Sequence, residues 1–112
     1  MALATVADYV ALARTLLMDT VDSPYRYPDA DLVRGLTLSI YETKKLRPDL
    51  MIGKTLPNFV NNDTTAVDMD EMYRVPLVYY MCGHAQMRDE EGNQDARAAG
   101  FLQLFRGQMG ST

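Results

Sequence analysis

A chain of 112 residues with 47% apolar residues has the size and composition of one globular domain, which excludes a disordered or fibrous protein. Fifteen acidic residues outnumber eleven basic ones, so the formal net charge is −4, and the basic residues are scattered along the chain. Because phosphate binding requires clustered Lys and Arg, we expect no basic nucleic-acid-binding surface.

Cys82 is the single cysteine, which excludes an internal disulfide and a CxxC metal or redox motif. The chain has no apolar run of about eighteen residues that could cross a membrane. Its amino terminus also lacks the basic segment and long apolar core of a signal peptide. We therefore expect a protein that is made, used or assembled in a cytoplasm.

The first predicted helix spans residues 5–19. Thr5 and Asp8 have capping-box spacing, and the apolar residues that follow recur at intervals of three and four. The second predicted helix spans residues 28–47. It begins with Pro28 and two acids and ends in three basic residues, as helix ends prefer.

Residues 48–67 form a predicted long loop, because glycine, proline and asparagine interrupt every period there. Loops of this length are uncommon inside compact domains and are usually functional or mobile. We expect an excursion away from the helices, with or without a short β-hairpin. The alternative is that the loop folds back over its own core.

The third predicted helix spans residues 70–88, with Asp68 and Asp70 as candidate caps and Pro76 either starting its main body or kinking it. The fourth spans 93–108 and carries small residues that allow close packing, as does the turn around Gly83. The prediction is an all-α fold: one domain over residues 1–112, a small four-helix bundle with a long irregular central loop.

No residue set predicts catalysis, a metal site or a cofactor. Cys82 and His84 stand two apart on a helix, so their side chains diverge by about 200° and cannot share a proton. The acids at 68–71 and 89–95 lack calcium-loop spacing and are interpreted as helix caps and solvated turns. The tyrosines lack the basic groove of base-stacking modules, which favours core and interface packing.

Three segments carry a resemblance to a known family: YRYPDADLVRGL at 25–36, ETKKLRPDL at 42–50 and DEMYRVPLVYY at 70–80. With an early helix before them and a last helix over 93–105 after them, the chain resembles the small head-to-tail adaptor proteins of tailed bacteriophages. Residues 51–67 match least. The sharpest matching elements are the entry to the second helix at Arg26 and its exit at Arg47-Pro48-Asp49.

The resemblance implies a non-enzymatic homo-oligomeric ring, usually of twelve copies, below the portal protein in the virion neck. Such a ring is assembled in the host cytoplasm, touches no membrane, and binds tail or nozzle proteins. Genomic double-stranded DNA passes through it without specific binding, and an acidic wall would suit that passage. The alternative function is a small cytoplasmic regulatory or nucleic-acid-binding helical protein.

Apolar loop residues without a helical face to hide them favour burial against a partner. The carboxyl end, which glycines are expected to make flexible, is a second candidate for reaching a neighbour. The predicted contact residues for portal, neighbour or tail are Met51, Ile52, Leu56, Phe59, Val60, Phe105, Arg106 and Met109.

Overall fold

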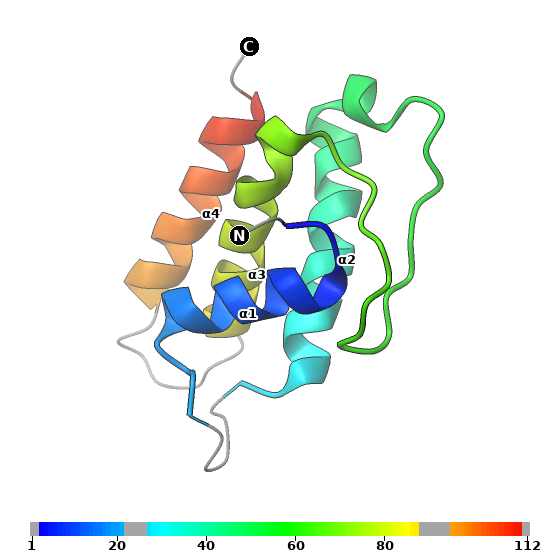
Figure 1. The fold of residues 1–112 in the computed structure, drawn as a ribbon. Helices are drawn as coiled ribbons and strands as arrows, with labels where there is room; N and C mark the ends of the chain where they lie inside the picture. The colour runs from blue at the N-terminus through cyan, green and yellow to red at the C-terminus, as the bar shows by residue number, and fades with distance from the viewer. Residues whose placement is uncertain (1–2, 22–26, 88–94, 111–112) are drawn as a thin grey trace.

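The computed structural model describes residues 3–21, 27–87 and 95–110. The described chain is helical, which confirms the all-α prediction. Three helices run alongside one another and the first crosses them (Figure 1). The elements are α1 Val6–Leu17, α2 Asp29–Leu46, α3 Arg74–Met87 and α4 Asp95–Gly110, with short 3-10 turns η1 Pro48–Met51 and η2 Glu71–Tyr73.

The amino terminus of α1 has the predicted capping box. The Asp8 N–H donates to the Thr5 hydroxyl, and the Asp8 carboxylate accepts from the Thr5 N–H at 3.1 Å. The backbone N–H groups of Thr5 and Ala4 hold the pKa of the Asp8 carboxyl below its usual range. The helix ends at Leu17, two residues before the predicted end, because Met18 adopts a left-handed conformation with φ 58°.

A buried arginine joins α1 to the start of α2. Arg14 Nη1 donates to the Asp19 carboxylate and to the Tyr27 carbonyl, both at 2.9 Å, and Arg14 Nη2 pairs with Asp29. The Tyr27 N–H also donates to Asp19, at 2.9 Å. These bonds tie α1 to the start of α2 through the buried pair of Arg14 and Asp19 and through the half-exposed Asp29.

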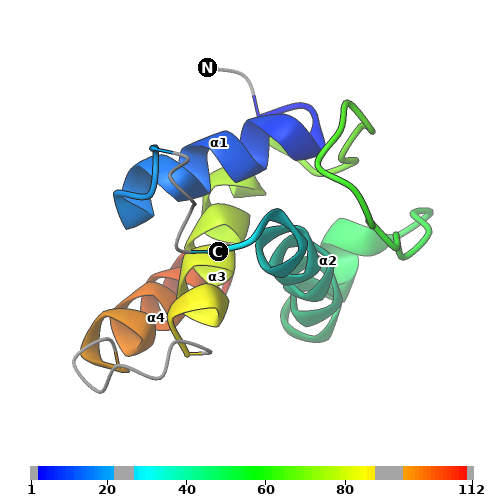
Figure 2. The same cartoon turned by 90° about the horizontal axis from the view of Figure 1, so that it is seen from below.

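The α3 helix lies between the others and contacts α1, α2 and α4. Figure 2 shows this central position. A Cβ atom added at Gly35 of α2 would lie 3.3 Å from Met81 Cα, and one at Gly83 would lie 2.9 Å from the Leu102 side chain of α4. The predicted close approach at Gly83 is therefore confirmed, and glycine is required there by space.

The start of α3 differs in detail from its predicted start. Asp70 caps the η2 turn by accepting the Met72 N–H at 3.0 Å, whereas Asp68 lies at the surface against Lys54. The α-helix proper begins at Arg74, which places Pro76 in its first turn as predicted. At the other end of the chain, α4 continues to Gly110, two residues past its predicted end, and Asn93 lies outside the described residues.

The loop does not leave the helices, so the predicted excursion is wrong. Its outgoing arm is held to α2 by the Phe59 N–H, which donates to the Thr37 hydroxyl at 3.1 Å. Its returning arm supplies the Thr65 and Asp63 carbonyls to the N–H groups of Val6 and Ala7, at 3.0 and 2.9 Å. In the described chain the β structure is one isolated bridge, Thr5 with Ala66, rather than a hairpin. The loop lies close because its backbone groups find partners on α1 and α2.

Candidate interaction surfaces

Three of the predicted contact residues belong to the protein's own core. Met51 is 6% exposed, Phe105 is 2% exposed and Met109 is fully buried. The Phe105 ring packs edge-on against Tyr80 of α3, with centroids 5.0 Å apart. Reaching a partner would require unpacking these side chains, so the structure corrects their placement at a surface.

The end of α4 is anchored as far as the structure describes it. Arg47 Nη1 donates to the Met109 carbonyl at 2.9 Å, and the Arg47 guanidinium lies over the Tyr73 ring, 5.2 Å from its centre. Arg47 also forms two bonds with the Asp49 carboxylate, at 3.1 and 3.0 Å, which raises the Arg47 pKa above its usual range. Up to Gly110, the end of the chain is therefore helical and bonded to Arg47, so the prediction of a free, flexible end is wrong for these residues.

The other predicted contact residues keep some surface. Ile52 is 79% exposed and Val60 is 69% exposed, and Arg106 is also exposed. Leu56 and Phe59 are half-buried against the core, as the alternative of a folded-back loop predicted. The exposed part of the predicted set is thus Ile52, Val60 and Arg106.

Sequence reasoning missed several exposed apolar positions on helical elements, among them Met72 and Leu104. Met72 in η2 is 83% exposed, and Leu104 of α4 is partly exposed. Both had been assigned no role, because a single apolar residue outside a helical stripe has no periodicity to mark it.

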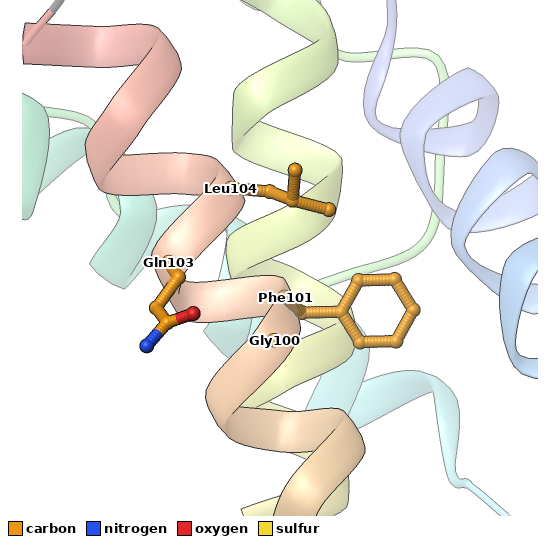
Figure 3. Close-up of a pocket in the computed structure, with 4 residues that line it drawn as sticks. All are labelled: Gly100, Phe101, Gln103 and Leu104. Atoms are coloured by element: carbon orange, nitrogen blue, oxygen red, sulfur yellow. The ribbon is translucent and has the colours of Figure 1, made fainter.

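The outer face of α4 holds a shallow, open hollow. Phe101 and Leu104 project to the same side of the helix, whereas Gln103 points away and Gly100 leaves space between them (Figure 3). The Phe101 ring stacks on Tyr79 of α3, with centroids 6.2 Å apart. A flat apolar face of this kind suits contact with another protein better than enclosure of a small molecule.

A second surface, the α2 groove, lies between the solvent side of α2 and the outgoing arm of the loop. Its loop wall is residues 58–60, and its helix wall includes the exposed cation Arg34. The lining residues are Ala30, Arg34, Thr37, Leu38, Tyr41, Asn58, Phe59 and Val60.

The polar residues considered for chemistry do not come together. Cys82 is buried with its thiol 3.7 Å from the Ala13 carbonyl of α1, whereas His84 stacks beside Tyr80 on the α2 side of α3. Across residues 3–21, 27–87 and 95–110, no three His, Cys, Asp or Glu side chains converge to hold a metal ion. The acids Asp89, Glu90 and Glu91 lie outside the described residues.

Most of the described tyrosines serve packing, whereas Tyr41 of α2 is partly exposed. Tyr27 is buried, and Tyr79 and Tyr80 pack on α4. Tyr9 is fully buried, and this burial raises the pKa of its phenol well above the usual range. Tyr25 lies outside the described residues.

Within the described segments, no helix combines the length and apolar character needed to span a bilayer. Comparison of the chain with protein-family models, with curated proteins and with solved structures finds no match in any of the three.

Proposed function

We propose that this chain is a structural head-to-tail adaptor subunit of a tailed phage. In this function, copies form a ring below the portal, link the portal to tail proteins and continue the DNA channel. The resemblance of residues 25–36, 42–50 and 70–80 to such adaptors supports the proposal.

One structural observation carries the proposal furthest. Ile52, Val60 and Met72 are large apolar side chains, each more than two-thirds exposed, on the connection between α2 and α3. Burying each such side chain would release about 1.5–3 kcal/mol. A subunit that binds neighbouring copies and partner proteins would bury these side chains in its contacts.

The charge supports the same function. Fifteen acidic residues against eleven basic ones give the chain a formal net charge of −4. A wall of this sign repels phosphates rather than retaining them, which suits a conduit for double-stranded DNA.

The test is the mass of the native chain, alone and mixed with the portal protein encoded in the same genome. A ring of chain copies bound to the portal is expected, and twelve is the number that the resemblance implies. Failure to bind that portal at any concentration would contradict the adaptor function. Salt-dependent binding of free duplex DNA would instead favour the regulatory, nucleic-acid-binding alternative.

A matched pair of variants tests whether the loop provides the contact. Ile52→Asp places a charge at an exposed apolar position of the loop, and portal binding or ring assembly should weaken by at least about tenfold. Met18→Asp places the same charge on an equally exposed methionine at the end of α1 and should leave assembly unchanged. Equal effects of the two variants would show that the loop has no special part.

A further inference from the structure

The α2 groove has an apolar centre beside one exposed cation, Arg34, whereas Lys45 lies one turn of α2 beyond the groove and pairs with Glu42 at 3.4 Å. Arg34, Leu38, Tyr41 and Lys45 follow one another at intervals of three or four residues, so they form one stripe along the exposed side of α2. Val60 from the loop adds an apolar wall beside that stripe. A ligand that matches this groove therefore has an apolar side chain next to negative charge.

The returning arm of the loop has the complementary pattern. Over residues 68–72, three carboxylates, Asp68, Asp70 and Glu71, are exposed and are followed by the exposed side chain of Met72. Asp68 pairs with Lys54 of the same chain at 3.3 Å, so Asp70 and Glu71 are the carboxylates that the arm offers to a partner. We name residues 68–72 the acidic arm. In this arm Met69 points inward and is buried, so the exposed atoms are carboxylates and one methionine.

The groove and the acidic arm are built from different elements of one subunit. The Val67 N–H donates to the Ala4 carbonyl at 2.9 Å, which fixes the arm beside the start of α1, and η2 leads directly into α3. The groove instead uses the solvent side of α2 and residues 58–60. Figure 2 shows the segment entering α3 on the α1 side of the molecule. The arm is therefore held on its own subunit at both ends, and Met72 and its neighbouring carboxylates are exposed there.

We propose that the α2 groove binds the acidic arm of a second copy of this chain. Met72 enters the apolar centre between Leu38 and Tyr41, and the carboxylates of Asp70 and Glu71 face Arg34. The inference rests on the proposed function and specifies its subunit contact. Because the two surfaces differ, the contact is head-to-tail, and a head-to-tail contact that closes gives a ring. Pairing of two grooves would instead bring like charges together.

The contact can be tested directly by paramagnetic relaxation in solution. An unlabelled Met72→Cys chain in a Cys82→Ala background carries a spin label at position 72 and is mixed with an ¹⁵N-labelled, untagged chain. The expected result is broadening confined to amides near Arg34, Leu38, Tyr41 and Val60. Broadening elsewhere, or none up to the solubility limit, would overturn the proposal.

A charge exchange tests the same contact by its strength. Arg34→Glu and Glu71→Arg should each weaken self-association by at least about tenfold, because like charges then face each other. The double variant restores opposite charges with their places exchanged and should recover most of the lost affinity. Lys44→Glu makes the same charge change on α2 outside the groove and should have little effect.

The outcomes separate this inference from the proposed function. If Arg34→Glu still forms a ring on the portal like the unaltered chain, the groove contact is wrong and the adaptor function stands. If the charge exchange holds but no portal binding occurs, the groove contact stands and the adaptor function fails.

Discussion

The two connections that flank α2 are held in opposite ways. The connection from α1 to α2 is organised by Arg14, which is buried between Asp19, Asp29 and the Tyr27 carbonyl. The connection from α2 to α3 is longer and is held by many separate contacts, which are single hydrogen bonds and the buried side chains of Met51, Val67 and Met69. A buried charge network concentrates stability in one side chain, whereas dispersed contacts divide it among many. Substitutions should therefore act globally in the first connection and locally in the second.

The largest expected effect is that of Arg14→Leu. This change leaves the Asp19 carboxylate buried without its cation, and loss of one partner of a buried pair costs about 3–5 kcal/mol. The free energy of unfolding from urea titration should fall by this amount. Lys44→Leu, which removes an exposed cation of α2 outside the groove, should change it by no more than about 0.5 kcal/mol. Equal losses would remove the contrast between a buried and a surface cation.

A smaller effect is expected for Arg47→Ala, at the start of the second connection. The change removes the donor to the Met109 carbonyl and the contact with the Tyr73 ring. Amide hydrogen exchange should accelerate severalfold in the last turn of α4 while the core of α3 keeps its protection. Lys44→Ala is the matched control, since Lys44 is an exposed basic residue three positions earlier. Exchange that accelerates equally in α3 would show that Arg47 supports the whole fold.

The smallest effect is expected for Thr37→Val, which removes the hydroxyl that binds the Phe59 backbone. The loss should be about 1 kcal/mol or less, and it should appear as faster amide exchange near residue 59 rather than as a lower urea midpoint. Thr15→Val, which removes a hydroxyl bonded within α1, should leave this region unchanged. A fall in stability as large as that of Arg14→Leu would place the loop in the cooperative core.

The helices could be predicted from the sequence because their ends carry their own signals. Thr5 and Asp8 cap α1 as expected, and Pro48 follows the end of α2. Phe105 and Met109 lie four residues apart, so helical periodicity also places them on one face of the fourth helix. Periodicity could not show that this face packs inside the subunit. It predicts which residues share a helix face, but it does not predict whether that face contacts the same subunit or another protein.

The path of the loop could not be predicted, since it depends on main-chain bonds. The carbonyls of Asp63 and Thr65 that bind α1 have no side-chain signature, and any residue could supply them. The burial of Arg14 was likewise invisible, because an arginine on a predicted amphipathic helix usually faces solvent. The acidic arm and the α2 groove depend on the path of the loop between α2 and α3, so they could not be predicted from the sequence.

The junction between the returning arm and α1 also has a consequence for synthesis. Val6 and Ala7 are made early, yet the carbonyls that receive their amide protons belong to Thr65 and Asp63. During translation, α1 therefore leaves the ribosome well before the residues that accept the hydrogen bonds of its first amides have been synthesised. More than half of the chain must be translated before that terminus acquires its final partners.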